Sequence, residues 1–458
     1  MKITETIAAI SSSAGNSGIG IIRISGDEAI EIADKVFKSY KNIKLKDAQS
    51  HTVHYGHIKD GDKILDQVLV IVLKNPHSYT GEDTVEIDCH GGMLILKKVL
   101  ELVIKSGARA AEPGEFTKWA FLNGKIDLSQ AEAVMDLINS KNDFALDSSI
   151  NQLKGKVSEQ IKKIRSNILY HIAFIESALD DPEHISLDGY DKEIESMLDE
   201  NILEIDKMIK SFDNGKIMKE GIKTVILGKP NAGKSSLLNL MLGEERAIVT
   251  DIEGTTRDTL EENINLGGIS LKIIDTAGIR NTEDKVEQIG VNKAKEMAEK
   301  ADLIIFVADG SKKSDDNDKE IIDIIKNKQA IILINKTDIN MVIDVEELKK
   351  NSGRDVILFS AKSGEGMECL ENEISEMFYS GKVTYNDQIY ITNARHKEAL
   401  DNAYKSLCQV KNSVEACMPE DFYSIDLMDA YTDLGLIIGE SVEDDLVNEI
   451  FSKFCMGK

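Results

Sequence analysis

The stretch KTVILGKPNAGKSSLLN, residues 223–239, decides the fold of the middle of the chain. It starts as an apolar run of strand type and leads into GKPNAGKS, residues 228–235, which fits the pattern G-x-x-x-x-G-K-[ST]. Between a strand and a helix, this pattern forms a loop whose backbone N–H groups bind phosphate oxygens at the helix N-terminus. We therefore predict a phosphate-binding loop in which Lys234 reaches the β- and γ-phosphates and Ser235 binds magnesium.

Three further motifs follow the loop, each at the end of an apolar run. Asp275, which ends one run, can hold magnesium through water, and Gly278 lets its backbone N–H approach a γ-phosphate. Asp338, in NKTD, offers two acceptor oxygens to the N1–H and 2-amino group of guanine, a pair of donors that adenine lacks. SAK, residues 360–362, can close over the base. Open α/β sheets bind ligands at the carboxyl ends of their strands, so the four elements together predict a GTP site.

Ile279 stands where Ras-type GTPases carry the glutamine that orients the attacking water. An isoleucine side chain forms no hydrogen bond, so hydrolysis needs another group to hold the water. The segment DKVEQIG supplies the carboxylates of Asp284 and Glu287. From spacing alone, Glu287 has two interpretations: it orients the water, or it is an exposed residue of a helix. Spacing favours the exposed helix residue.

The charge that develops on the phosphates also needs a partner. Thr256, in the segment TDIEGTTRD, can supply a second magnesium ligand. Asn231 places an amide oxygen in the phosphate-binding loop, and together with carbonyl oxygens of a nearby loop it suits a hard monovalent cation. Such a cation would neutralise charge as an arginine finger does.

Composition narrows the class of protein. The chain has 458 residues, 42% of them hydrophobic, and a formal net charge of −25. The length predicts roughly two to four domains, and the acidity disfavours loose nucleic-acid binding, which needs clustered lysine and arginine. The five cysteines show no CxxC pattern, and no run approaches the ~18 apolar residues of a membrane span. We therefore expect a cytoplasmic protein with reduced thiols and no membrane segment.

Hydrophobic patterning divides the chain into segments. Apolar residues at steps of three and four from Ile150 to Leu179 predict one continuous helix. Buried strand-like runs that alternate with helices after residue 220 predict a parallel α/β sheet. The expected fold is therefore multidomain, α+β and α/β, with an α/β domain inserted into a helical domain. The expected segments are 1–121 (α+β), 122–219 (first helical part), 220–379 (α/β nucleotide-binding domain) and 380–458 (second helical part).

The chain resembles the MnmE (also TrmE) family of tRNA modification GTPases over essentially its whole length. The segments that carry the resemblance are TIAAI and GIGIIRISG, SYTGEDTVEIDCHGG, AEPGEFTKWAFLNGKIDLSQAEAV, GKPNAGKSSLLN, AIVTDIEGTTRD, DTAGIR, NARH and the terminal FCMGK. The resemblance implies an N-terminal tetrahydrofolate-binding domain that also forms a homodimer, a discontinuous helical domain, and an inserted Ras-like P-loop G domain of TrmE type.

The resemblance also implies how GTP is hydrolysed without the glutamine. Potassium binds beside the phosphates, and two G domains pair across the dimer. In this sequence Glu287 would orient the water, which overturns the interpretation from spacing. The implied potassium ligands are Asn231 and Thr255 through side chains and Thr250 and Ile252 through main-chain oxygens, and the magnesium ligands are Ser235 and Thr256. The expected nucleotide-binding set is Gly228, Asn231, Ala232, Gly233, Lys234, Ser235, Ser236, Thr250, Asp251, Ile252, Glu253, Gly254, Thr255, Thr256, Asp275, Thr276, Ala277, Gly278, Asn335, Lys336, Asp338, Ser360, Ala361 and Lys362.

The reaction implied by the resemblance places a carboxymethylaminomethyl or aminomethyl group on carbon 5 of the wobble uridine of certain tRNAs. An FAD- and NADH-using partner of MnmG type shares the work in a heterotetramer, and a methylene-tetrahydrofolate supplies the one-carbon unit. The expected folate cofactor is 5-formyl- or 5,10-methylene-tetrahydrofolate. The implied folate contacts are Arg23, Glu86, Lys125 and Lys458.

Cys455, in the terminal motif, has two interpretations: a reactive thiol brought to the folate, or a small hydrophobe buried at a helix end. Two departures from the family pattern concern charge. Asn16 stands near the place of an arginine, and Glu253 replaces a small residue in the potassium-binding segment.

Two other functions are alternatives to tRNA modification. A ribosome-assembly or regulatory GTPase would add a basic RNA-binding module, and a folate-dependent transferase with a relic G domain would show broken nucleotide motifs.

Overall fold

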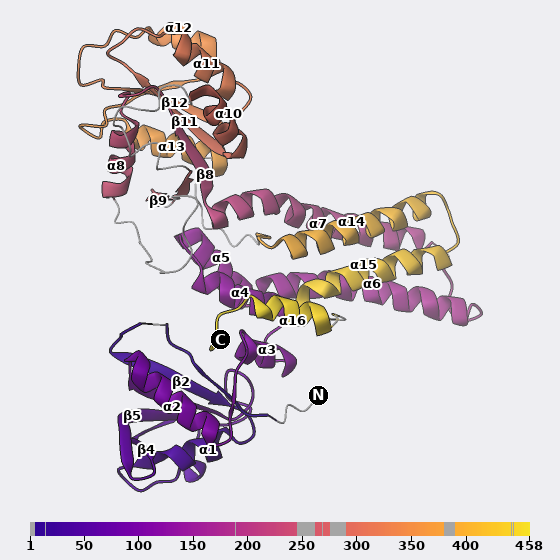
Figure 1. Cartoon of the computed structure of the whole chain (residues 1–458). Coiled ribbons are helices and arrows are strands. Elements are labelled where there is room, and N and C mark those ends of the chain that lie inside the picture. Colours follow the sequence, from indigo (N-terminus) through magenta and orange to yellow (C-terminus); the bar gives the residue numbers. More distant parts are fainter. Residues whose placement is uncertain are drawn as a thin grey trace. The chain divides into compact units, whose positions relative to one another are not determined.

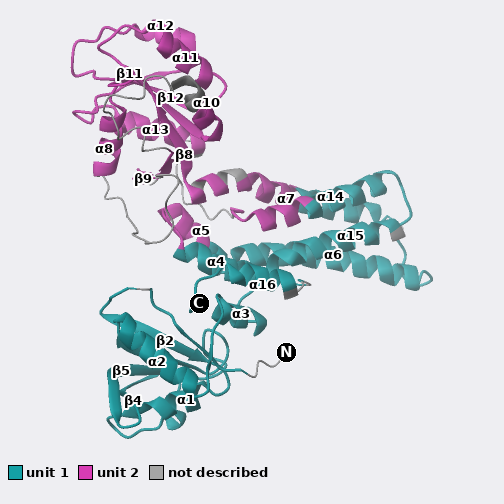
Figure 2. Ribbon diagram, in the orientation of Figure 1, with its two compact units in different colours: residues 1–138, 150–202, 402–458 teal, residues 139–149, 203–401 magenta. Residues whose placement is uncertain are grey.

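The computed structural model describes residues 5–13, 15–187, 189–244, 262–267, 269–274, 290–379, 390–440, 442 and 444–458. Contacts divide the chain into two compact units (Figure 2). Unit 1 comprises residues 1–138, 150–202 and 402–458, and unit 2 comprises residues 139–149 and 203–401. The four-segment boundaries expected from the sequence remain a prediction.

The elements of unit 1 form a sheet followed by helices (Figure 1). They are β1 (Ile7–Ile10), β2 (Ile19–Ser25), α1 (Ala29–Val36), β3 (Phe37–Ser39), the 3₁₀ turn η1 (Leu45–Asp47), β4 (Thr52–Asp60), β5 (Lys63–Leu73), β6 (Thr84–His90), α2 (Met93–Lys105), β7 (Arg109–Ala110), α3 (Glu115–Leu122), α4 (Leu128–Ile138), α6 (Lys156–Asp180), α15 (Asp421–Ile438) and α16 (Asp444–Ser452).

Unit 2 holds the strands and helices of the predicted α/β domain. They are β8 (Ile222–Leu227), α8 (Lys234–Glu244), β9 (Glu262–Leu266), β10 (Ile269–Ile273), α10 (Gly290–Lys300), β11 (Leu303–Asp309), α11 (Asp316–Ile325), β12 (Ala330–Asn335), α12 (Val345–Ser352), β13 (Val356–Leu358) and α13 (Met367–Tyr379). Three helices belong partly to each unit: α5 (Asp143–Leu153), α7 (Asp191–Glu220) and α14 (Ala394–Glu415).

The N-terminal sheet has the strand order β3-β4-β5-β6-β2-β1-β7, with β1 and β7 parallel and the other pairs antiparallel. Side chains alternate between its faces. On β2, Ile22 and Ile24 are fully buried in the core that α1 and α2 share with the sheet. Arg23 between them points to the other face, where the register places it opposite Glu86 of β6. The open face of this sheet therefore carries the residues expected to bind folate.

The second sheet has the order β13-β12-β11-β8-β10-β9, parallel except for β9 at its edge. Every residue of β11 and β12 is buried, because α8 and α13 cover one face of the sheet and α10, α11 and α12 cover the other (Figure 1). This confirms the predicted Ras-like P-loop domain within a multidomain α+β and α/β fold. The phosphate-binding loop and the NKTD motif both lie at carboxyl ends of its strands.

The helix predicted to run without a break from residue 150 to 179 is two helices. α5 ends at Leu153 and α6 begins at Lys156. Gly155, between them, has φ 88°, a left-handed backbone conformation that interrupts the helical ladder. Apolar periodicity did not reveal the break because Val157, Ile161 and Ile164 continue the buried stripe in α6.

Arg165 joins α6 to α15 within unit 1. Its side chain is 7% exposed, its Nε donates to the carbonyl of Tyr431 at 3.1 Å, and its Nη1 donates to the carboxylate of Glu440. The guanidinium carbon lies 4.0 Å from the centre of the Tyr431 ring. A buried cation with these partners helps to set the register of the two helices.

In the part of the chain that the structure describes, no helix is both long and apolar enough to cross a membrane.

His171 of α6 makes the stability of unit 1 depend on pH. Its Nδ1 lies 2.6 Å from the hydroxyl of Tyr190, and both side chains are buried. Burial lowers the pKa of His171 below its ordinary value of 6.5, although Glu193 opposes the shift. A histidine with a lowered folded-state pKa binds fewer protons than the unfolded chain below pH 6.5. Its contribution to stability is therefore present above pH 6.5 and is lost as the pH falls below it.

We predict that the melting temperature of unit 1 falls more between pH 7.5 and pH 5.5 in the native protein than in His171→Gln. Glutamine keeps a hydrogen-bonding group for Tyr190 but does not titrate. Fluorescence of Trp119, the chain's single tryptophan, which is buried in α3, reports the transition. His184→Gln, at the exposed histidine that pairs with Asp181, is the control and should not flatten the pH dependence. If the melting temperatures of the native protein and of His171→Gln fall equally with pH, His171 is not the source of the pH dependence.

Candidate functional site

The phosphate-binding loop runs from Gly228 to Gly233, between the end of β8 and the start of α8. A Cβ on Gly228 would lie 2.4 Å from the carbonyl oxygen of Val307, and one on Gly233 would lie 1.9 Å from the Nδ2 atom of Asn335. Both glycines also have positive φ, 152° and 101°. The two glycines of the sequence pattern are therefore required by the close approach of β11 and β12.

Lys234 folds back over this loop. Its Nζ donates to the carbonyl oxygens of Gly228 and Lys229, at 2.7 Å each. Burial lowers the pKa of Lys234. Its ammonium group thus lies within the phosphate-binding loop, where the phosphate oxygens of a nucleotide would be further acceptors.

Asn335, at the end of β12, connects the loop to the SAK motif and is itself the first residue of NKTD. Its side chain is buried, its Nδ2 donates to the carbonyl of Ala232 at 2.9 Å, and its Oδ1 accepts from the N–H of Ala361 at 2.9 Å. One amide therefore joins the phosphate-binding loop, NKTD and SAK. The expected members of these motifs lie together, as the pattern at strand ends predicted.

Asp338 is held by a residue of the SAK motif. Ser360, fully buried, donates from its Oγ to Asp338 Oδ1 at 3.1 Å. The Oγ1 of Thr337 donates to the carbonyl of Phe359 at 3.0 Å, which ties NKTD to the end of β13. The Asp338 carboxylate keeps acceptor capacity beyond the serine bond, as two guanine donors would require. Lys362 of SAK is exposed.

Asp309 is a residue of the site that sequence reasoning missed. It ends β11 opposite Asn335 in the parallel register, and its Oδ2 accepts from Lys336 Nζ at 2.7 Å. Burial would raise the pKa of Asp309, but hydrogen bonds from Lys336 and Ser311 outweigh it, so the pKa lies below its ordinary range. The run DLIIFVADG contains this aspartate at a strand end, which was the available signal.

Several expected residues lie outside the part of the chain that the structure describes. They are the catalytic residue Glu287, the switch and potassium segment Thr250, Asp251, Ile252, Glu253, Gly254, Thr255 and Thr256, and the turn Asp275, Thr276, Ala277 and Gly278. Of the expected cation ligands, the structure describes two. Asn231 is exposed in the loop with φ 62°, and Ser235 lies in the first turn of α8.

The expected folate residues Arg23 and Glu86 form an ion pair on the open face of the N-terminal sheet. Arg23 Nε lies 2.7 Å from Glu86 Oε1, and the two side chains are 16% and 19% exposed. The guanidinium carbon lies 5.5 Å from the ring centre of Phe116 and 5.8 Å from that of Tyr79. The surface around the pair thus presents a carboxylate, a guanidinium and two aromatic rings, and these groups suit a flat, polar heterocycle.

The C-terminal tail lies against the same surface. The carbonyl of Gly457 accepts from Arg23 Nη1 at 3.4 Å, and the carbonyl of Lys458 accepts from the N–H of Phe116 at 3.2 Å. A Cβ on Gly457 would lie 2.3 Å from the carbonyl oxygen of Ile10, so the tail packs closely on β1. Residues 434 positions apart in the chain therefore meet at one place.

The other expected residues near this surface differ in exposure. Lys125 donates from Nζ to the carbonyl of Pro76 at 3.0 Å, and Asn16 is exposed. Cys455 is also exposed, so the interpretation of this residue as a buried small hydrophobe is wrong. Cys89 is the buried cysteine, and burial, with Asp66 and Asp88 nearby, raises its pKa to about 12. At neutral pH Cys89 therefore stays an unreactive thiol.

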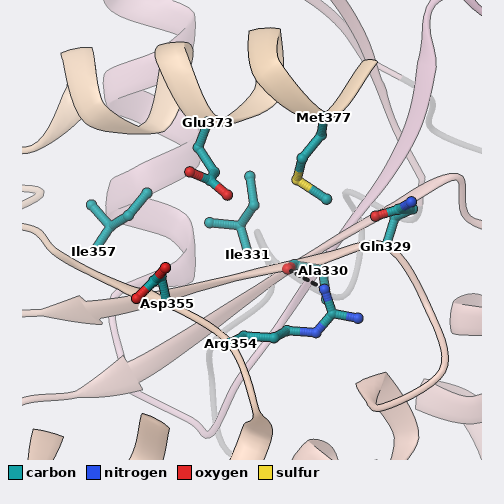
Figure 3. A pocket seen from close by; sticks show the side chains of 8 residues that line it. All are labelled: Gln329, Ala330, Ile331, Arg354, Asp355, Ile357, Glu373 and Met377. Atoms are coloured by element: carbon teal, nitrogen blue, oxygen red, sulfur yellow. Dashed lines mark hydrogen bonds between the residues drawn. The ribbon is translucent and has the colours of Figure 1, made fainter. Parts of the chain in front are cut away.

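A small pocket of about 260 Å³ lies elsewhere in unit 2, where β12 begins (Figure 3). The Arg354 guanidinium beside it donates to the carbonyls of Ile325, Lys328 and Ala330 and so closes the end of α11. The pocket is at the edge of the sheet opposite Asn335, and we therefore assign it no part in nucleotide binding. Its lining residues are Gln329, Ala330, Ile331, Arg354, Asp355, Ile357, Glu373 and Met377.

Two family models match the chain. The MnmE helical domain matches residues 128–455, and the GTP-binding protein TrmE N-terminus matches residues 6–125. A similar solved structure is the G domain of the T. maritima FeoB iron transporter, at 27% identity over 34% of this chain and 97% of that chain, with a TM-score of 0.26.

Curated relatives are similar over their full length. The tRNA modification GTPase MnmE of Lachnoclostridium phytofermentans is 55% identical over 456 residues, which cover 99% of this chain and 100% of the relative. The proteins of the same name from Acetivibrio thermocellus and Clostridioides difficile are 50% and 48% identical. The first covers 99% of each chain and the second 100% of each chain.

We predict that Asn335→Ala raises the dissociation constant for GTP at least about tenfold, because the carbonyl of Ala232 and the N–H of Ala361 both lose a buried partner. Titration with a fluorescent GTP analogue measures the change. Asn327→Ala, at an exposed asparagine just beyond α11, is the matched control and should bind like the native protein. Native affinity in Asn335→Ala would show that the amide does not organise the site.

Proposed function

Because the chain belongs to the MnmE family of tRNA modification GTPases, we propose that it hydrolyses GTP with the help of potassium in order to modify the wobble uridine of its tRNA substrates at carbon 5. The group installed is carboxymethylaminomethyl or aminomethyl. The observation that supports the GTP-dependent part best is the buried amide of Asn335, which holds the phosphate-binding loop and the base-binding motifs in one site.

In the proposed GTP site, Lys234 binds the phosphates and Asp338 binds the guanine edge. Ser235 and Thr256 hold magnesium, and Asn231, Thr250, Ile252 and Thr255 hold potassium. The residues that the structure describes fit this assignment. Asn231 offers an amide oxygen, a hard ligand, from an exposed side chain in the phosphate-binding loop. The cations supply charge neutralisation when bound, and Glu287 orients the attacking water.

The proposed folate site is the surface around Arg23 and Glu86. The Glu86 carboxylate can accept two donors from the amino-pyrimidine edge of a pterin, and the rings of Tyr79 and Phe116 lie close to Arg23. Since Arg23 and Glu86 touch each other, both act at the same end of the ligand. Lys125 and Lys458 are the proposed further contacts for a 5-formyl- or 5,10-methylene-tetrahydrofolate, and the exposed Cys455 is the candidate thiol.

The proposed partners are a second copy of the chain, an FAD-dependent protein of MnmG type and the tRNA. The open face of the N-terminal sheet suits the second copy. Tyr55, Val53 and Leu69 are exposed there, and Tyr40 stacks on Tyr55 with ring centres 4.9 Å apart. Clustered exposed apolar side chains of this kind mark protein contacts. We place the complex in the cytoplasm, in line with unpatterned, reduced cysteines.

We predict that GTP hydrolysis is much faster in potassium chloride than in sodium chloride at equal ionic strength. Asn231→Ala should lose this difference, and Glu287→Ala should lose at least about a hundredfold in rate while it still binds GTP. Steady-state phosphate release and nucleotide titration measure the two quantities. Equal rates in the two salts would defeat the potassium proposal and leave the GTPase assignment intact.

We predict that Glu86→Gln weakens binding of 5-formyl-tetrahydrofolate about tenfold or more, because a neutral amide offers one acceptor oxygen where the carboxylate offers two. GTP hydrolysis by this variant should match the native rate. Calorimetry measures the binding, and nucleoside analysis of tRNA from cells that carry only the variant should show unmodified wobble uridine. Glu82→Gln, on the loop before β6, is the control. Unchanged folate affinity in Glu86→Gln would refute the assignment of the site.

A further inference from the structure

Lys229, the second residue of the phosphate-binding loop, is held by two carboxylates at the start of α11. Its Nζ lies 2.6 Å from Asp318 Oδ2 and 2.9 Å from Asp315 Oδ2. The side chain of Lys229 is 16% exposed and that of Asp318 is 3% exposed. The sequence pattern of the loop allows any residue at this position, so it assigns Lys229 no role.

The two carboxylates are themselves fixed by the helix they begin. Asp315 is the N-cap of α11 and accepts from the N–H groups of Asn317 and Asp318, while Asp318 accepts from the N–H of Asp315. This reciprocal capping box orients both side chains. The second oxygen of Asp318, Oδ1, is buried and has no hydrogen-bond partner among the residues that the structure describes. Lys229 is therefore the cation that compensates a nearly buried carboxylate.

The backbone of Lys229 is also a junction within the loop. Its carbonyl accepts from Lys234 Nζ at 2.7 Å and from the N–H of Ala232 at 3.3 Å. Ala232 is in turn held by Asn335. The loop is thus attached at one point to β12, through Asn335, and at a second point to α11, through the side chain of Lys229.

The direction of the Lys229 side chain excludes the simplest alternative, a second lysine that binds phosphate directly. Its ammonium group is already paired with two carboxylates, and a phosphate placed there would meet their negative charge. Burial would lower the pKa of Lys229, but the hydrogen bonds that its ammonium group donates to Asp318 and Asp315 raise it. The group therefore stays a permanent cation of the ion cluster.

We propose that Lys229 is a positioning residue for GTP binding: through Asp318 and Asp315 it holds the phosphate-binding loop against the N-terminus of α11, and it is not a phosphate ligand. A loop held in this way keeps its backbone N–H groups directed at the phosphates before the nucleotide arrives, which lowers the ordering cost of binding. The inference rests on the GTPase activity of the family and is independent of the potassium and folate proposals.

A double-mutant cycle on the full-length protein tests the proposal. The variants are Lys229→Met, Asp318→Asn and the two combined, and the readout is the dissociation constant of fluorescent GDP and GTP analogues. Each single change should weaken binding about tenfold. The combined variant should be no weaker than Lys229→Met, because the two residues act as one unit. Lys229→Arg should restore most of the affinity, since arginine can pair with both carboxylates.

The rate of hydrolysis separates positioning from chemistry. At saturating GTP, Lys229→Met should keep the native kcat and show a raised KM. The matched control is Lys326→Met, which breaks the exposed pair with Asp323 at the other end of α11 and should change neither constant. Circular dichroism checks the fold. If Lys229→Met fails to fold, Asp315→Asn takes its place, because asparagine also caps a helix but removes the charge.

Three results would overturn the proposal. If Asp318→Asn binds nucleotide as tightly as the native protein while Lys229→Met is weak, the lysine acts on the phosphates directly. If the effects of Lys229→Met and Asp318→Asn on affinity are additive, the two residues do not act as one unit and the ion cluster does not position the loop. If all three variants, Lys229→Met, Asp318→Asn and Asp315→Asn, bind nucleotide with the native affinity, the cluster belongs to the surface of α11 and plays no part in nucleotide binding.

Discussion

The nucleotide site depends on one buried amide, that of Asn335. Its two hydrogen bonds, to the carbonyl of Ala232 and from the N–H of Ala361, join three segments that are more than a hundred residues apart at their extremes. The parallel pairing of β11 and β12 places the amide, since it sets Asp309 opposite Asn335. Gly233 must then be a glycine, because a Cβ would collide with the amide nitrogen. The glycine of the sequence motif is thus required by the position that the sheet topology gives to the Asn335 amide.

In unit 1, the guanidinium of Arg23 joins the N-terminal sheet to the end of the chain. It pairs with Glu86 across the sheet and reaches the carbonyl of Gly457 at the end of the chain. The tail can lie there because Gly457 has no Cβ to meet Ile10. Here the described parts of the GTP site lie in unit 2, and the expected folate residues lie in unit 1.

Where sequence reasoning failed, the reason was local backbone geometry or long-range pairing. The apolar stripe from Ile150 to Leu179 concealed the break at Gly155, because periodicity records which side chains are buried and not whether the backbone is continuous. Cys455 turned out to be exposed because the tail is held by its backbone carbonyls. The ion cluster of Lys229 with Asp315 and Asp318 was invisible, since nothing in the spacing of those residues brings them together.

The sequence by itself determined the class of the fold, the family, and the order of the nucleotide motifs, because apolar runs and glycine patterns reflect local burial and local backbone demands. It also determined which residues are expected to contact GTP. Only the tertiary structure decided which side chains hold those motifs in place. Asp309, Asp318 and the carbonyl of Gly457 acquire their roles through contacts between distant segments. Such contacts depend on strand register and helix packing, and neither is recorded in the spacing of residues along the chain.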